Sequence, residues 1–100
     1  MQSDDLIQSI HLQMEENKQR RYALEEERDN LIADKEFLEY DLHEFENRKQ
    51  EMSEEKRMMI ESMTIPEIKE KIETIEARIR EIAYVLIHLS HEWDQIGRKQ

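Results

Sequence analysis

The sequence has very few of the residues that interrupt helices and none of those that form disulfides. Its 100 residues include one proline, Pro66, one glycine, Gly97, and no cysteine. Without cysteine the chain has neither a disulfide nor a thiolate ligand for a metal ion. With a single glycine it has no glycine-rich loop that could hold a phosphate group. The scarcity of both helix breakers predicts long, uninterrupted helices.

Long apolar segments are missing as well. No stretch approaches the roughly 18 apolar residues that a membrane-spanning helix needs. Residues 1–5 include two aspartates and lack the apolar core of a signal peptide. The sequence therefore predicts no membrane partner. A soluble intracellular protein is the default expectation, and nothing in the sequence specifies the compartment.

Charged residues are abundant, and acidic ones dominate. They make up 40 % of the chain against 37 % hydrophobic residues, and the net charge is −10. Residues 1–63 hold 18 acids and 9 bases, a net charge of −9, whereas residues 64–100 hold 7 acids and 6 bases, a net charge of −1. An acidic surface disfavours phosphate backbones and anionic lipids, so no nucleic-acid partner is expected. The composition favours an elongated coiled coil over a globular core.

A heptad pattern runs through residues 1–63 and predicts one long helix. The d positions are almost all apolar at regular 3,4 spacing, whereas five of the nine a positions hold Lys or Arg. Long basic side chains suit a narrow seam, because their charged ends can reach water. Asn17 occupies a d position, which is typical either of a buried amide that fixes register or of a frayed, solvent-exposed end.

A break in the helix is predicted at residues 64–67. Thr64 and Glu67 form a capping-box pattern, and Pro66 is tolerated in the first turn of a helix. A second helix with an isoleucine-rich seam is predicted over residues 65–97, followed by a short tail at 98–100. The seams of the two helices differ in phase by two residues, which a continuous supercoil absorbs poorly.

The predicted fold class is all-α, a long helical hairpin or coiled coil. Folding the chain back about residue 64 would bring residues 82–89, apolar nearly all round, opposite residues 37–45. The second helix would pack antiparallel on residues 31–62, and residues 1–30 would form a projecting acidic arm. Two hairpins would then join as a dimeric four-helix bundle over part of their length. A straight parallel dimer is the alternative.

The heptad positions define two groups of candidate site residues. The first group is predicted to form the core and the oligomer interface: Leu31, Leu38, Leu42, Phe45, Met52, Met59, Ile68, Ile72, Ile75, Ile79, Ile82, Leu86, Leu89 and Trp93. The second group lies on the predicted arm and is expected to bind a partner protein: Ile7, Ile10, Met14, Asn17, Arg21, Leu24 and Arg28.

No group of residues points to catalysis or to a cofactor. His88, His91 and Glu92 share one helix face, but their order differs from the His-Glu-x-x-His pattern of zinc peptidases. Acidic pairs occur throughout, so none stands out as a catalytic acid and base. Thin helices are also expected to enclose no water-excluding pocket. The sequence therefore predicts no metal site, no cofactor and no enzymatic activity.

The predicted function is a structural or adaptor role as a coiled-coil module for oligomerisation and protein–protein interaction. Its expected partners are a second copy of the chain, giving a homodimer, and another protein. One alternative is a small acidic regulator that covers a basic surface of a partner protein, with salt-sensitive binding. Another is a helical stalk or chaperone component of a larger machine, in which the hairpin pairs with a different chain.

Overall fold

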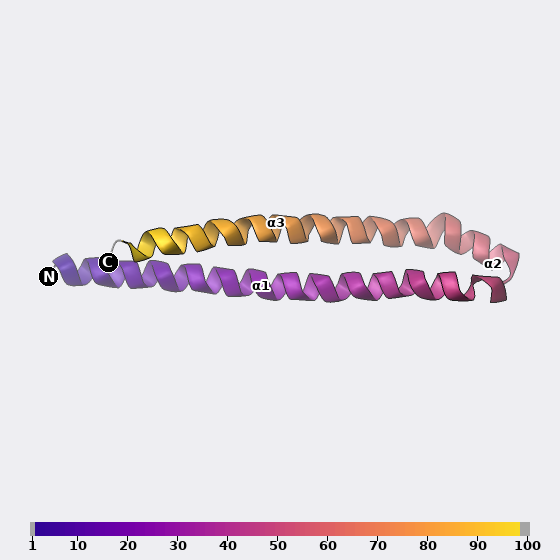
Figure 1. The fold of residues 1–100 in the computed structure, drawn as a ribbon, viewed down its shortest axis with the longest axis horizontal. Helices are drawn as coiled ribbons and strands as arrows, with labels where there is room; N and C mark the ends of the chain where they lie inside the picture. The colour runs from indigo at the N-terminus through magenta and orange to yellow at the C-terminus, as the bar shows by residue number, and fades with distance from the viewer. Residues whose placement is uncertain (1, 99–100) are drawn as a thin grey trace. The chain divides into compact units, whose positions relative to one another are not determined.

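The computed structural model describes residues 2–98, and these residues are helical almost throughout. Helix α1 spans Gln2–Arg48, α2 spans Glu54–Met59 and α3 spans Ile65–Gly97 (Figure 1). A 3₁₀ helix at Lys49–Glu51 follows α1, and a π helix at Ile60–Thr64 joins α2 to α3. No strand occurs within residues 2–98. The predicted all-α fold class is confirmed.

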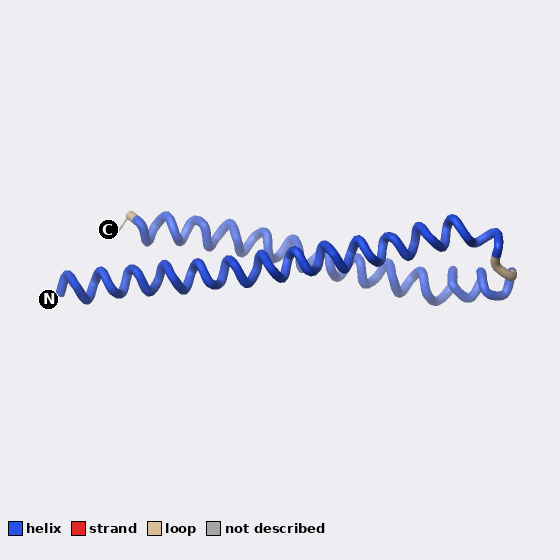
Figure 2. Tube along the Cα trace, turned by 90° about the horizontal axis from the view of Figure 1, so that it is seen from below, coloured by secondary structure: helices blue, strands red, loops and turns tan. Residues whose placement is uncertain are grey.

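The helices pack as two compact units. The end unit combines α1 as far as Arg28 with α3 from Arg80 onward, and the turn unit spans Asp29–Ile79. Within each unit a segment of α1 lies beside a segment of α3 that runs in the opposite direction (Figures 1 and 2). The predicted helical hairpin is therefore confirmed, whereas the dimeric four-helix bundle remains a prediction.

The chain reverses at residues 49–53, not at the predicted residues 64–67. After α1 and its 3₁₀ turn, Met52 and Ser53 adopt extended backbone conformations (Figure 2). The Ser53 hydroxyl then caps α2 by accepting a hydrogen bond of 3.2 Å from the backbone N–H of Lys56. Serine is among the best N-cap residues, and Glu54 with Glu55 suits the positive end of the helix dipole. The predicted first helix over 1–63 is thus too long.

Pro66 lies inside a continuous helical stretch. In the π helix before it, the N–H of Ile65 donates to the carbonyl of Ile60, five residues earlier. A proline removes a backbone donor and its ring crowds the carbonyl four residues back, and a local π turn accommodates both effects. The proline therefore marks an irregular turn within the returning helix, although α3 does begin at Ile65.

The position of the reversal also corrects the predicted register. Residues 82–89 belong to the end unit, where the Leu89 carbonyl accepts a hydrogen bond from Asn17. Residues 37–45 belong to the turn unit instead. The predicted juxtaposition of these two segments is wrong, because it assumed a fold about residue 64.

The narrow seam leaves a thin core. Positions at 3,4 spacing in α1 from Ile10 to Phe45, and in α3 from Ile65 to Ile96, are buried or half-buried. Most of them are only half-buried, because two helices cover each other along a single stripe. The buried apolar side chains of the described residues are Ile10, Phe45, Ile82, Leu89 and Ile96.

Replacing Ser53 with Ala is expected to weaken the hairpin at its reversal. The N–H of Lys56 would lose its acceptor, which lowers the free energy of unfolding by about 1 kcal/mol. Urea unfolding followed by circular dichroism measures the change, and Ser53→Asp should restore most of it. Ser62→Ala is the control, because the exposed Ser62 hydroxyl only donates to a carbonyl of its own turn. Equal losses in Ser53→Ala and Ser62→Ala would contradict a specific role for the cap.

Candidate interaction surfaces

A buried amide interrupts the apolar seam of the end unit. Asn17 is 1 % exposed, and it is the buried polar side chain of the described residues. Its Nδ2 donates a hydrogen bond of 2.8 Å to the Leu89 carbonyl, and its Oδ1 accepts one of 2.8 Å from Nε of Arg21. Of the two interpretations that the sequence allowed, the buried amide is correct.

Arg21 connects the amide to the only tryptophan of the chain. Its Cζ lies 4.8 Å from the centroid of the Trp93 ring, a cation–π arrangement. Side chains on a helix lean toward its N-terminus, so Arg21 leans toward Asn17 and Trp93 leans toward Leu89. A basic residue at an a position thereby places its guanidinium between the amide oxygen of Asn17 and the ring of Trp93. We call Asn17, Arg21, Leu89 and Trp93 the polar cluster.

The polar cluster ties the end unit to one register. Sliding α3 along α1 would move the Leu89 carbonyl away from the Asn17 amide. A buried amide without a partner costs about 1–3 kcal/mol, so other registers are disfavoured. No buried side-chain nitrogen or oxygen within the described residues lacks a hydrogen-bond partner in the present register.

The structure corrects the predicted partner-binding arm. Residues 4–9 are exposed, but from Ile10 onward the seam of α1 is covered by the chain's own α3. A projecting segment therefore exists, but it is much shorter than residues 1–30. In the set predicted to bind a partner, Ile7 is 49 % exposed, and the others are buried or half-buried: Ile10, Met14, Asn17, Arg21, Leu24 and Arg28.

The predicted core residues lie on the seam with one exception. All are buried or half-buried except Met59, which is 57 % exposed. The reversal at residues 49–53 separates Met59 from the heptads of α1, so its predicted position no longer applies. Their predicted second role, in an oligomer interface, remains a prediction.

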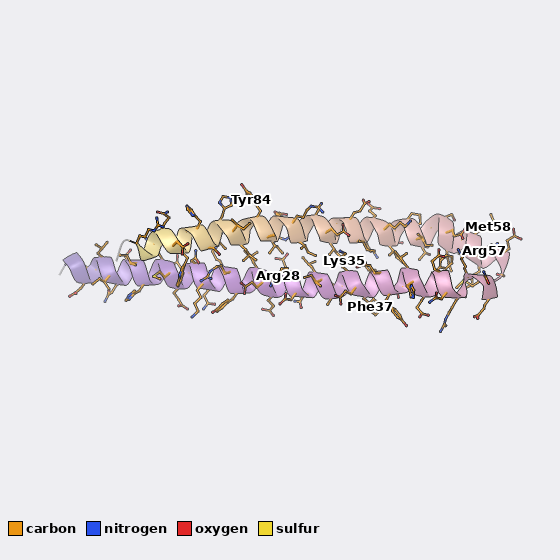
Figure 3. All side chains as sticks on the ribbon, viewed as in Figure 1. Arg28, Lys35, Phe37, Arg57, Met58 and Tyr84 are labelled. Atoms are coloured by element: carbon orange, nitrogen blue, oxygen red, sulfur yellow. The ribbon has the colours of Figure 1, made fainter. Side chains whose placement is uncertain are left out.

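The end unit exposes a pair of large apolar side chains on α3. Tyr84 is 65 % exposed and Ile87 is 70 % exposed. Figure 3 shows Tyr84 pointing away from α1, and its ring contacts that of His88 edge-on at 4.5 Å between centroids. Residues three apart share a helix face, so Tyr84 and Ile87 form one surface. We call these two residues the outer face.

The turn unit exposes two aromatic side chains on α1. Phe37 is 67 % exposed and Tyr40 is 58 % exposed. A hydrogen bond to the Glu44 carboxylate, together with the charge of that carboxylate, raises the pKa of the Tyr40 phenol above its usual value. Phe37 has no polar atom and presents a purely apolar surface to water. Its side chain points outward from the α1 ribbon (Figure 3).

An open groove of about 650 Å³ lies between α1 and α3 in the turn unit. Three acidic side chains, Asp34, Glu67 and Glu70, line the groove together with one basic side chain, Lys71. Lys71 forms an ion pair of 3.3 Å with Glu67. We call it the acidic groove. The residues that define it are Asp34, Phe37, Leu38, Glu70, Lys71 and Ile75.

The described residues present no cluster suited to a metal ion. No group of three or more His, Asp or Glu side chains in this part of the chain is arranged to hold one, and His88, His91 and Glu92 form no such group. None of the helices in the described residues is long and apolar enough to cross a membrane.

The fold and its surfaces define this chain as an all-α helical hairpin with a polar cluster in its seam. Comparison with protein-family models, with curated proteins and with solved structures finds no match. The function proposed below therefore rests on the residues of this chain alone.

Replacing Asn17 with Ala tests the polar cluster. The variant loses both hydrogen bonds of the amide and leaves a small void in the seam. We expect the free energy of unfolding to fall by about 1–3 kcal/mol, measured by urea unfolding. Asn30→Ala is the matched control, because Asn30 is exposed on the same helix and its loss should change stability by less than about 0.5 kcal/mol. Similar effects of both variants would contradict a structural role for Asn17.

Replacing Arg21 with Gln tests the contact with Trp93. Since Trp93 is the single tryptophan, the intrinsic fluorescence reports on this ring alone. Removing the guanidinium exposes the ring face to water, so we expect the emission maximum to move to longer wavelength. Arg20→Gln changes the charge equally at an exposed neighbour and should leave the emission unchanged. An unchanged emission in Arg21→Gln would show that the cation–π contact does not persist in solution.

Proposed function

We propose that this chain is a non-enzymatic helical hairpin module with a structural or adaptor role, and that it acts through oligomerisation and protein–protein interaction. The observation that supports this function best is the outer face of the end unit. Tyr84 and Ile87 are two large side chains that are mostly exposed to water and do not belong to the seam that holds the hairpin. Exposed apolar surface of this kind is typical of protein-binding sites.

One segment of α3 carries two apolar faces. Ile82 and Leu89, seven residues apart, are 0 % and 3 % exposed and fill the seam. Tyr84 and Ile87 lie between them in sequence and face outward. A helix that is apolar on more than one side is typical of a helix with more than one packing partner. The hairpin supplies one partner, and the outer face is left for another.

A second copy of the chain is the partner that we propose for the outer face. Helix α3, residues 65–97, holds 7 acids and 4 bases, a net charge of −3, against −9 for residues 1–63, so two α3 helices repel each other less than two α1 helices would. Full burial of a side chain such as Ile87 contributes about 1.5–3 kcal/mol. Tyr84 adds a large ring whose hydroxyl can stay at the wet edge of the interface. This arrangement gives a homodimer that joins through α3.

Replacing Ile87 with Glu is expected to weaken the homodimer by at least about a hundredfold, because each of the two copies loses about 1.5–3 kcal/mol of apolar burial. Sedimentation equilibrium over a range of protein concentrations measures the dissociation constant. Asn30→Glu is the control, because it adds the same charge at an exposed position of α1, the helix that does not carry the outer face. The helical content of both variants should match that of the unmodified chain, since neither residue belongs to the seam.

Two results would contradict the proposal. A dimer that tolerates Ile87→Glu as well as Asn30→Glu would show that the outer face is not the interface. An unmodified chain that stays monomeric at all accessible concentrations would rule out self-association. The hairpin would then have to act by pairing with a different protein.

A further inference from the structure

We infer that the acidic groove of the turn unit is a docking site for an amphipathic helix of another protein, whose apolar stripe is flanked by Lys or Arg. This partner and this surface are separate from the second copy proposed for the outer face. The shape of the groove, its charge and the exposure of Phe37 each support the inference.

The shape of the groove suits a third helix. It lies between α1 and α3, and Leu38 and Ile75, which line it, are only half-buried by the two-helix seam. Side chains of a helix pack into the groove between neighbouring helices, as they do in bundles. A helix seated here would complete the burial of seam residues that two helices leave partly open.

The charge of the groove determines which residues suit the positions beside the apolar stripe of the partner helix. Lys71 is already paired with Glu67 at 3.3 Å, which neutralises one acid and one base. Asp34 on α1 and Glu70 on α3 then remain as two carboxylates, one contributed by each helix. A helix lying in the groove would bring its apolar stripe between them and its flanking positions beside them. Lys or Arg at those positions would complement both carboxylates.

A second copy of this chain fits the groove poorly. The whole chain has a net charge of −10, and α3 alone, residues 65–97, holds 7 acids and 4 bases. Either of its helices would bring further carboxylates toward Asp34 and Glu70, and like charges across an interface disfavour a partner. Charge complementarity therefore selects a basic helix from another protein.

Phe37 provides an anchor at the rim of the groove. It lines the groove from α1 and is 67 % exposed, so most of its side chain is open to a partner. A partner can therefore cover the ring without opening the seam. An aromatic side chain that becomes buried in an interface removes a large apolar area from water.

The first test measures binding of the full chain to a synthetic amphipathic peptide by isothermal titration calorimetry. The peptide carries Leu at positions i, i+3, i+4 and i+7 and Lys at the flanking positions. Glu70→Lys should weaken binding about fivefold, because one attractive charge contact becomes repulsive. Glu73→Lys makes the same charge change one turn further along α3, outside the groove, and should weaken binding less than about twofold.

A second pair of variants tests the apolar contact. Phe37→Ala should weaken peptide binding about tenfold, as expected for the loss of an aromatic anchor. Tyr22→Ala removes another exposed ring from the same helix, in the end unit instead of the turn unit, and should leave the affinity nearly unchanged. Neither residue belongs to the seam, so circular dichroism should show an unaltered fold in both variants.

Several results would overturn the inference. Failure of the basic peptide to bind would contradict the inference. Equal effects of Glu70→Lys and Glu73→Lys would also contradict it, because they would indicate diffuse attraction to an acidic surface. If a peptide with Glu in place of Lys bound equally well, charge complementarity would not select the partner. Dissociation of the homodimer into monomers in Glu70→Lys would show that the groove binds a second copy of the chain. Ile87→Glu should leave peptide affinity unchanged, so this inference and the proposed function can fail separately.

Discussion

The end unit depends on a single buried amide. Asn17 connects α1 to the backbone of α3 through the Leu89 carbonyl, and Arg21 satisfies its oxygen while contacting Trp93. An apolar seam of similar side chains would be compatible with several alignments, because hydrophobic contact has no direction. A hydrogen bond in a water-poor seam has both direction and a cost when broken, so it selects one alignment.

That alignment decides which surfaces are left for partners. With Ile82 and Leu89 committed to the seam, Tyr84 and Ile87 necessarily face outward on α3. The net charge is also unequal, at −9 in residues 1–63 and −1 in residues 64–100. The outer face, on the less acidic of the two long helices, is therefore suited to self-association, whereas the acidic groove is suited to a basic partner.

The helices and their inward faces were predictable from the sequence, and the chain reversal was not. The heptads of α1 up to Phe45 and the seam of α3 follow from local spacing and are inward-facing in the structure. The break was predicted at Pro66 because proline is a stronger helix-breaking signal than a serine followed by glutamates. The sequence signal for the actual reversal was Ser53 followed by two glutamates. In the sequence alone this segment looks like the exposed acidic face of a continuing helix. The structure shows that the Ser53 hydroxyl caps a new helix by accepting a hydrogen bond from the N–H of Lys56.

The sequence by itself determined the all-α class, the heptad seams, the acidic charge and the lack of cysteine chemistry, because each depends on residue type and spacing within a few turns. Only the tertiary structure decided the register, the burial of Asn17 and the separation of residues 82–89 from residues 37–45. The amide of Asn17 and the carbonyl of Leu89 are 72 residues apart in the chain. Their pairing depends on where the chain reverses, and a shift of that reversal redirects every contact between the two helices.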